Sequence, residues 1–551
     1  MSYHFSRKPT RRTFLRSTGL AGLGLIGAGV VGCGDDDDDA PGGDASATAS
    51  GAASPTASNA GRKLDPSKVL RLNGSDIDSF DAQTGTGGNG QQFLWTVFDN
   101  LVAYDSKLNV KEDRSLASKW EVPDPLTVVF TLRSGVKFHD GTDFNASAVV
   151  ANYEHVVNDG ARSGAVADLQ AVDRVEAVDP ITAIFHMKRP DGGLFTKLGD
   201  RPGFQNSPTA LMKYGSSFAN GDYKRNPVGT GAFKFKGWQE GSFIQVEKFD
   251  GYWQAGHPNI QGVDWRVIPD PNTAFAAFRT GDLDVLWGLD SKNMKTVKDM
   301  SGVTFAQQAG VSIPSFMLNT ARPPFNNPHA GRAVSYAINR QAIVDALFNG
   351  TARKAATWIG PGNAEFDPNY QGLWFDEAKA RSELSVGGLT DGFEFMITGS
   401  ENPKDAEMLQ AVQAQLAKFK IKMTVEFNKD FVARFRDDHI GDGFYSAYSG
   451  RAEPSQSFNF KDAASGVYAS GGAKATDDKF ETMLADLEST LDFEARRKKL
   501  YELADRVNEL GWDVFLWHPD TLVAHYDTLA FEVFGDGKPH LGQGDVTAYA
   551  S

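Results

Sequence analysis

The sequence predicts an α/β protein built from two or three packed units. Its 551 residues are too many for one hydrophobic core, and 41% hydrophobic with 23% charged residues is the composition of an ordinary globular chain. Residues 393–397 read as a strand, 403–419 as an amphipathic helix and 421–427 as a second strand. This βαβ pattern favours a parallel sheet with helices on its faces. No period of about 20–50 residues repeats, which argues against a solenoid or propeller.

The remaining elements follow from apolar spacing, taken in chain order. Strands are expected at 69–72, 127–132, on both sides of the Asp179-Pro180 turn within 175–187, in a hairpin at 229–247, at 264–268 and at 281–287. Helices are expected at 91–104, at 146–157 from a cap at Asn145, at 272–280, and as a helical pair within 480–510.

Residues 1–32 have the features of an export signal. They carry five basic residues and no acid, and end in a glycine-rich apolar run that is too short to cross a bilayer. The stretch TRRTFLR at 10–16 resembles a twin-arginine signal through Arg11 and Arg12, and VVGC at 30–33 resembles a lipobox ending in Cys33. We therefore expect an exported protein held by lipid on Cys33 at the outer face of the cytoplasmic membrane, in a periplasmic or extracellular setting. A plain secretory signal with an incidental cysteine is the alternative.

Cysteine content and charge exclude several classes of function. Cys33 is the only cysteine, so disulfides within the chain and thiolate-based metal or redox sites are excluded. Residues 33–62 are rich in Asp, Gly, Ser and Ala and have little to bury, so we expect a disordered linker. The net charge is −14, and it becomes more negative once the signal is removed. Binding to nucleic acid or electrostatic attraction to anionic membrane is therefore not expected.

The sequence lacks the common catalytic and cofactor-binding motifs. Residues 85–90 have the G-x-G-x-x-G spacing, but no strand leads into them, so we interpret the segment as a loop. The chain has no Walker A motif, no H-E-x-x-H and no G-x-S-x-G. No two of its ten histidines share a helix face at i, i+4, so we expect no metal and no cofactor.

Aromatic side chains on predicted loops could line a ligand cleft, which typically combines apolar walls with a few oriented polar groups. Most of these rings should belong to the core. As candidate ligand contacts we select Phe80, Tyr448, Phe458 and Trp517.

Seven segments form a recognisable set over most of the mature chain. They are VFDNLVAYD at 97–105, LASKWEV at 116–122, FTLRSGVKFHDG at 130–141, NPVGTGAF at 226–233, DGYW at 250–253, GDLDV at 281–285 and AVSYAINR at 333–340. In this order the set resembles the extracytoplasmic solute-binding proteins of family 5, which serve oligopeptide, dipeptide and nickel ABC importers. No single segment would suffice, but the set is specific.

This resemblance implies a two-lobed periplasmic-binding-protein fold (type II, cluster C) with an extra inserted α/β domain. By analogy lobe I comprises residues 63–94, 223–311 and 512–551, the inserted domain 95–222, and lobe II 312–511, with two crossing strands as the hinge. The implied function is capture of a peptide or other small solute as the lobes close, followed by delivery to an ABC permease whose ATPase supplies the energy. It implies a monomer without catalysis that contacts the membrane only through its lipid. The scattered histidines give little support to a nickel or haem ligand.

The segment AYSGRAEPS at 447–455 departs from the family pattern. Peptide-binding members often place an aspartate shortly before the proline, where it pairs with the ammonium of the peptide. Here Arg451 lies near that place, and a guanidinium repels an ammonium but can fork onto a carboxylate or phosphate. We therefore add Arg451 to the candidate contacts and expect a ligand other than a standard free-amine peptide. A solvent-facing Arg451 is the alternative.

Two other functions stay open at this point. A lipid-anchored secreted hydrolase would need a nucleophile, a base and an orienting group in one pocket, and the motifs do not assemble such a set. A ligand sensor without transport would use the same cleft, so the sequence does not separate it from a transport protein.

Overall fold

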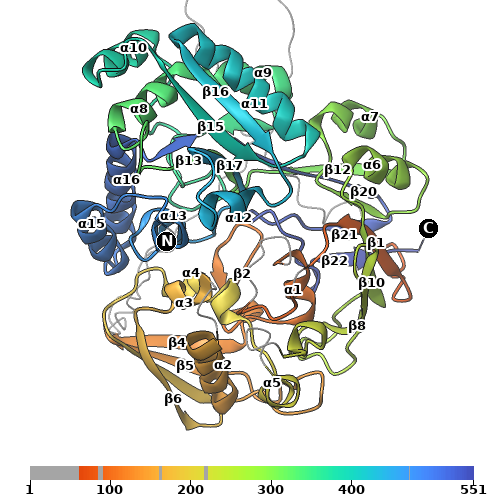
Figure 1. Ribbon diagram of the computed structural model, residues 1–551. Helices are drawn as coiled ribbons and strands as arrows, with labels where there is room; N and C mark the ends of the chain where they lie inside the picture. Colours follow the sequence, from red (N-terminus) through yellow and green to blue (C-terminus); the bar gives the residue numbers. More distant parts are fainter. Residues whose placement is uncertain are drawn as a thin grey trace, which may run out of the picture.

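Three sheets, each with its own helices, organise the chain into two lobes and an inserted domain (Figure 1). The computed structural model describes residues 61–77, 79–84, 91–159, 164–215, 221–470 and 472–550. The expected α/β class is confirmed. Arg11, Arg12, Cys33 and the glycine-rich segment 85–90 lie outside the described residues, so their interpretation stays a prediction.

A seven-stranded sheet in the order β12-β20-β11-β1-β10-β9-β8 forms the first lobe, on the right of Figure 1. Strand β1 runs parallel to β10 and β11, and the other neighbours are antiparallel. The strands are β1 (Val69–Gly74), β8 (Phe233–Gln239), β9 (Phe243–Lys248), β10 (Gly262–Val267), β11 (Val285–Trp287), β12 (Val303–Gln308) and β20 (Thr521–Tyr526). The helices are α1 (Gln91–Val97), α6 (Pro271–Arg279) and α7 (Met294–Lys298).

A five-stranded sheet in the order β16-β15-β17-β13-β18 forms the second lobe, at the top of Figure 1. Its strands are β13 (Ile313–Leu318), β15 (Phe393–Gly399), β16 (Ile421–Phe427), β17 (Gly443–Tyr448) and β18 (Asp513–Phe515). The parallel pairing of β15 with β16, joined through α11 (Pro403–Leu416) and a 3₁₀ turn (Ala417–Phe419), confirms the predicted βαβ unit. The other helices are α8 (Pro328–Ala337), α9 (Arg340–Leu347), α10 (Glu377–Val386), α12 (Phe431–Arg436), α13 (Pro454–Asp462), α14 (Val467–Ser470), α15 (Asp478–Glu488) and α16 (Phe493–Leu510).

An antiparallel four-stranded sheet in the order β4-β5-β7-β6 forms the inserted domain, at the bottom of Figure 1. Its strands are β4 (Ala117–Asp124), β5 (Thr127–Leu132), β6 (Val172–Asp179) and β7 (Thr182–Met187). Buried residues alternate with half-buried ones along β5 and β7, so one face of the sheet packs into the core and α2 covers it. The helices are α2 (Ala146–Asp159), α3 (Gly164–Asp168), α4 (Leu194–Lys197) and α5 (Pro208–Tyr214), with 3₁₀ turns η2 (Glu112–Arg114), η3 (Arg201–Gly203) and η4 (Tyr223–Arg225).

The chain crosses between the lobes twice, after β12 and after β18. Because β12 pairs with β20 in one lobe and β13 pairs with β18 in the other, the two crossings run side by side. Two short adjacent connections are the geometry of a hinge. Short ladders complete the molecule: β14 (Ala352–Lys354) with β19 (Trp517–Pro519), β2 (Ala103–Tyr104) with β3 (Val110–Lys111), and β21 (Leu529–Phe531) with β22 (Val546–Ala548).

Side-chain caps explain where the long helices begin. Asn145, Asn402, Asp477 and Asp492 each accept a hydrogen bond from a backbone N–H in the first turn of α2, α11, α15 and α16, respectively. Helix α16 ends at Gly511 with φ 61°, where a Cβ would lie 2.5 Å from the Pro328 carbonyl oxygen. The helical pair expected within 480–510 is confirmed as α15 and α16.

The helix expected over 91–104 is wrong in length, because α1 ends at Val97. Residues beyond it exchange helical hydrogen bonds for tertiary ones. Leu101 N donates to Gly203 O at 2.7 Å, and Val97 O accepts from Gly231 N at 3.0 Å. The Asp99 carboxylate is also held, by Tyr252 Oη at 3.1 Å and Trp253 Nε1 at 2.8 Å. These partners come from distant segments and leave no local signal.

The second lobe buries a cluster of opposite charges. Lys474 contacts the carboxylates of Asp462 and Asp513, with Oδ2 of Asp513 at 2.8 Å, and all three side chains are fully buried. Trp358 Nε1 also donates to Asp462, at 2.6 Å. This arrangement satisfies charges that would be very costly to bury singly.

Within the described ranges, no helix is both long enough and apolar enough to span a bilayer. The same ranges contain no group of three or more His, Cys, Asp or Glu side chains arranged to hold a metal ion.

Candidate ligand-binding site

A polar cavity lies between the inserted domain and the second lobe. Helix α3 and the start of η3 line one side, and the loop after β17 together with α13 lines the other. The lining residues are Gly164, Ala167, Asp168, Asp200, Arg201, Arg451, Gln456 and Phe460. The cavity volume is only about 10 Å³, so a ligand can enter only when the two sides separate.

Helix α13 holds its cavity residues on a rigid, buried support. Glu453 caps the helix by accepting from Ser455 N at 3.1 Å, and Pro454 occupies the first turn. Arg496 of α16 forms an ion pair with Glu453 from the side, and both side chains are almost fully buried. Gln456 is therefore held at the cavity wall with an exposed fraction of 3%.

Asp200 lies at the centre of the charges around the cavity. Its carboxylate is 3.8 Å from Arg451 Nε and 3.9 Å from Lys538 Nζ, and it accepts from Arg201 N at 2.9 Å. Burial alone would raise the pKa of Asp200, but Lys538, Arg451 and Arg201 outweigh it and hold the pKa below its ordinary value. Asp200 is thus ionised and committed to protein partners.

The pKa of Asp168, on the same side of the cavity, is shifted in the opposite direction. Burial raises its pKa to about 6, against the lowering effects of Lys197, Gln456 and Arg451. Gln456 lies close enough to lower the pKa of Asp168. Within the described structure, however, neither Nε2 nor Oε1 of its buried amide makes a hydrogen bond of standard geometry. An unsatisfied buried amide costs about 1–3 kcal/mol. The cavity therefore contains polar groups with bonding capacity to spare.

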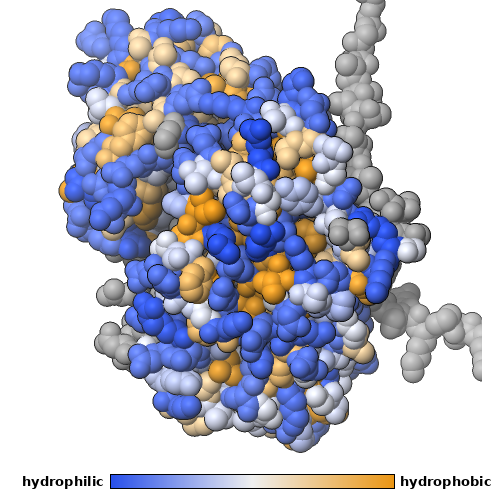
Figure 2. All heavy atoms as spheres, turned by 90° about the vertical axis from the view of Figure 1, so that its right-hand side faces the viewer, coloured by the Kyte–Doolittle hydropathy of each residue, from blue (hydrophilic) through white to orange (hydrophobic). Residues whose placement is uncertain are grey.

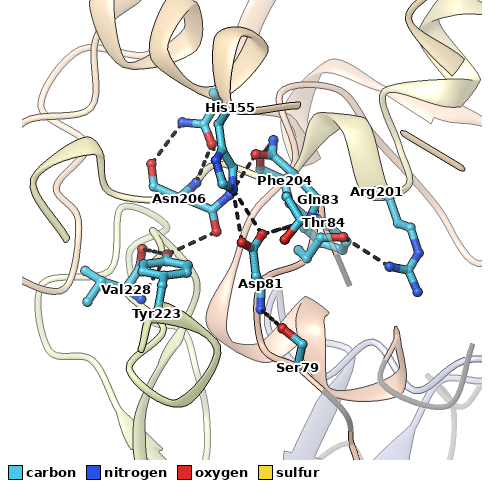
Figure 3. A network of polar contacts seen from close by, with 12 residues as sticks. Ser79, Asp81, Gln83, Thr84, His155, Arg201, Phe204, Asn206, Tyr223 and Val228 are labelled. Carbon is cyan, nitrogen blue, oxygen red and sulfur yellow. Dashed lines mark hydrogen bonds and ion pairs between the residues drawn. The ribbon is translucent and has the colours of Figure 1, made fainter. Parts of the chain in front are cut away.

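A buried network fastens the segment that carries Asp200 and Arg201 to the first lobe (Figure 3). Gln83 Nε2 donates to Phe204 O at 2.7 Å, and Asn206 Nδ2 donates to Gln83 Oε1 at 2.9 Å. Asp81 lies 3.1 Å from Nε2 of His155 on α2. Figure 3 shows these side chains converging from the loop after β1, from α2 and from the segment after η3. The first lobe and the inserted domain therefore present one rigid wall to the second lobe.

The C-terminal segment adds a second support beneath Asp200. Tyr104 Oη donates to Asp536 at 3.0 Å, and His540 Nε2 lies 2.9 Å from the same carboxylate. The His540 ring stacks on Phe534 at 3.9 Å between centroids. Lys538 lies between Asp536 and His540 in the sequence, so these contacts fix it beside Asp200.

A set of rim contacts joins the inserted domain to α15 and α16 of the second lobe. Arg189 Nη2 donates to Glu488 Oε2 at 2.5 Å, and Gly192 N donates to the Glu488 carbonyl at 2.8 Å. A Cβ on Gly192 would lie 2.0 Å from the Thr490 carbonyl oxygen, so only glycine allows this approach. These contacts belong to a closed arrangement of the two sides.

A second cavity, of about 230 Å³, lies where the crossing after β18 meets both lobes. Its lining includes Trp287 of the first lobe, Phe348 and Lys404 of the second, and Pro519 and Asp520 of the crossing. Figure 2 shows the side of the molecule that carries the first-lobe sheet, where hydrophobic side chains gather near the middle of a mostly hydrophilic face. This cavity has fewer charged groups than the first and is a less selective environment for a polar ligand.

Of the predicted ligand contacts, only Arg451 belongs to the lining of the polar cavity, and Tyr448 lies behind it. The Tyr448 ring lies 5.6 Å from the Arg451 guanidinium carbon. Phe458 is fully buried in the second-lobe core, and Trp517 packs at 5.4 Å against Phe348, which lines the second cavity. Phe80 is buried against Phe235 in the first-lobe core. As ligand contacts, all five residues stay predictions.

The search from sequence missed Asp168, Asp200, Arg201 and Gln456. Asp200 and Arg201 sit in a Gly- and Pro-containing stretch that reads as a loop, and nothing in their neighbourhood points to position 451. Their assignment required the packing of the inserted domain against the second lobe.

Comparison with known proteins gives one consistent result. The family described as bacterial extracellular solute-binding proteins, family 5 (middle region), matches residues 114–469. The glutathione-binding protein GsiB of Salmonella paratyphi A is 32% identical over 354 residues, which are 64% of this chain and 68% of that protein.

Solved structures agree on the fold. The periplasmic binding protein DppA of Helicobacter pylori, in complex with the peptide STSA, superposes with a TM-score of 0.78 at 23% identity, covering 89% of this chain and 99% of that one. AgaA of Agrobacterium tumefaciens R10, in complex with agropinic acid, gives a TM-score of 0.77 at 22% identity, covering 88% and 99%. The expected two-lobed fold with an inserted domain is confirmed.

Proposed function

The chain belongs to the bacterial extracellular solute-binding proteins of family 5, which are non-catalytic binding proteins of ABC importers, and we propose that its solute is a peptide or peptide-like molecule held between the lobes. Because the members of this family are non-catalytic binding proteins, the alternative of a secreted hydrolase is not supported. The glutathione bound by one relative and the peptide bound by another support a peptide-like ligand.

The observation that carries this proposal is the polar cavity between the inserted domain and the second lobe. Arg451 and Gln456 on one side and Asp168 on the other would surround any solute trapped there. Their positions at the boundary of two rigid units make their joint contact with a ligand depend on closure.

The mechanism follows from this dependence. In the open form the solute contacts one wall, and closure adds the groups of the other wall together with the rim contacts around Glu488. Because the bound solute interacts more favourably with the closed form, it shifts the equilibrium toward closure. The permease would then distinguish loaded from empty protein by shape.

For the termini and domains we keep the sequence-based proposal. The export signal with Arg11 and Arg12, lipid on Cys33 and a linker to residue 62 would tether a monomeric body outside the cytoplasmic membrane. Lobe I would comprise 63–94 and 223–311, with the inserted domain at 95–222 and lobe II from 312. The predicted return to lobe I at residue 512 is too early, because β18 (Asp513–Phe515) pairs with β13 in the second-lobe sheet, so the tail that completes lobe I begins after Phe515.

A thermal-shift screen tests the ligand class. Peptides of two to five residues, glutathione, free amino acids and sugars would each be added to the full chain. A solute at 100 times its dissociation constant should add about 2.7 kcal/mol to the free energy of unfolding. Stabilisation by sugars alone, with no peptide-like compound active, would contradict the proposal.

Uptake measurements separate transport from sensing. A strain lacking the gene should lose accumulation of the radiolabelled solute found in the screen, and regain it when the gene is restored. Unchanged uptake would assign the protein to ligand sensing instead.

Arg451 is proposed to receive a carboxylate of the solute, since a guanidinium can donate two parallel hydrogen bonds to it. Calorimetry of Arg451→Ala with the screened solute should show weaker binding, whereas Arg174→Ala, at an exposed position, should not. Unchanged affinity in the first variant would remove Arg451 from the site.

A further inference from the structure

We propose that the polar cavity is a subsite for a zwitterionic α-amino acid head, in which one carbon carries both an ammonium and a carboxylate. The inference rests on the proposed function, because it names the ligand class of that site. It arises from two opposite charges that different parts of the chain bring to one cavity, Asp168 from α3 and Arg451 from the loop after β17.

Arg451 provides the receptor for the carboxylate. A guanidinium has five N–H donors. Within the described structure, Arg451 makes one hydrogen bond, from Nη1 to its neighbour Gly450 O at 3.3 Å, and its 3.8 Å distance to Asp200 exceeds hydrogen-bond length. The Tyr448 ring, 5.6 Å from the guanidinium carbon, backs the group and limits its motion. Most of the fork is thus available for a bidentate carboxylate.

Asp168 and Gln456 provide the receptor for the ammonium. The carboxyl group of Asp168 and the amide of Gln456 line the same cavity, and the amide oxygen is buried without a standard hydrogen bond. An ammonium has three donors and no acceptor, so it can satisfy both oxygens at once. Its charge also favours the ionised form of Asp168, whose pKa burial otherwise raises to about 6.

Asp200 is a poorer candidate for contact with the ammonium. It caps η3, pairs with Lys538 and has an exposed fraction of 2%. Asp168 makes fewer contacts with charged groups of the protein than Asp200 does, and part of its surface is accessible.

The charge around the cavity is balanced, which favours a zwitterion over an ion of one sign. The charged side chains that line the cavity are two arginines, Arg201 and Arg451, and two acids, Asp168 and Asp200. A purely cationic head would be repelled by Arg451, and a purely anionic head by Asp168. A head with both charges meets a partner on each wall.

Two isomeric tripeptides test the inference. Glutathione, γ-Glu-Cys-Gly, carries an ammonium and a carboxylate on the α-carbon of its first residue. The α-linked isomer Glu-Cys-Gly has the same atoms and net charge, but its first α-carbon carries only the ammonium. Calorimetry with the full chain under reducing conditions should give glutathione an affinity at least about tenfold higher than that of the isomer.

Variants then connect this ratio to the cavity. Asp168→Asn and Arg451→Lys should each reduce the glutathione preference severalfold, and Arg451→Gln should abolish it. Asp173→Asn, at an exposed position on β6 close to α3 in sequence, should leave the preference unchanged. Circular dichroism and thermal unfolding of each variant establish that it is folded, and the lysine variant keeps the charge if the glutamine variant fails to fold.

Several outcomes would overturn the inference and leave the proposed function intact. The first is equal or tighter binding of the α-linked isomer, and the second is binding of other peptides but of neither isomer. The third is an equal loss of affinity for both isomers in Asp168→Asn, which would mean that Asp168 only joins the two walls and does not contact the ligand. A glutathione preference that responds to Lys404→Gln but not to Asp168→Asn would place the head in the second cavity. If no peptide-like compound binds at all, the proposed function itself is wrong.

Discussion

Replacing Gly192 by alanine should weaken solute binding by keeping the inserted domain away from the second lobe. A Cβ at this position would lie 2.0 Å from the Thr490 carbonyl oxygen and 3.0 Å from Arg496 Cδ. Contacts below about 3.0 Å do not occur without displacement, and the oxygen belongs to the backbone just after α15. The two walls must therefore move apart by about an ångström or more.

The displacement removes the closed-state contacts around Glu488. The hydrogen bond from Gly192 N to the Glu488 carbonyl, at 2.8 Å, and the charge-assisted one from Arg189, at 2.5 Å, both depend on this approach. Losing one neutral and part of one charged hydrogen bond costs the closed form about 1.5–3 kcal/mol. The open form lacks these contacts, so the loss appears as an increase of about 10- to 150-fold in the apparent dissociation constant.

Calorimetry with glutathione, or with another peptide stabilised in the screen, measures this change, and small-angle scattering of the loaded protein should show a larger radius of gyration. Gly237→Ala is the matched control, because a Cβ there meets no atom within 4 Å. If Gly192→Ala bound the solute as tightly as the wild type and gave the same scattering curve, closure through this rim would be refuted.

The other predictions concern stability, followed by urea unfolding and tryptophan fluorescence. Lys474→Met removes the ammonium that directly contacts two buried carboxylates and should cost about 3–5 kcal/mol. Lys479→Met, at an exposed site, should stay within about 0.5 kcal/mol, and equal losses would contradict the buried cluster. Leu409→Ala, in the second-lobe core, should cost about 2–5 kcal/mol and the exposed Val386→Ala far less, and a small loss at Leu409 would argue against that packing. As the pH rises from 4 to 7, the free energy of unfolding of the ligand-free wild type should fall by about 1–3 kcal/mol relative to that of Asp168→Asn. The reason is that a carboxyl whose pKa is raised to about 6 binds more protons in the folded than in the unfolded protein over this pH range. A pH-independent difference would refute the burial of its charge.

Local pattern predicted most of the regular structure. The βαβ unit from Phe393 to Phe427 was predictable because each of its elements has a clear period of its own. The end of α1 at Val97 was not, because the backbone groups that would continue the helix bond instead to Gly203 and Gly231. Boundaries set by distant partners carry no local signal.

The candidate site was predictable only in part. The departure at Arg451 could be noticed because it interrupts a motif of known order, and the structure does place its side chain at the polar cavity. The large aromatic residues Phe80 and Phe458 were selected by residue type alone, and both are buried in the cores of their lobes. Residue type does not distinguish a ring that lines a cleft from one that fills a core.

By itself the sequence determined the α/β class, the order of most elements, the family and the presence of a cation at position 451, since these properties depend on local periodicity or on the order of short motifs. The tertiary structure alone decided which acids face that cation. Asp168 and Asp200 reach the cavity because the inserted domain is fastened to the first lobe and closes on α13. Contacts of this kind depend on how whole units pack against each other, and that is not recorded in the spacing of residues along the chain.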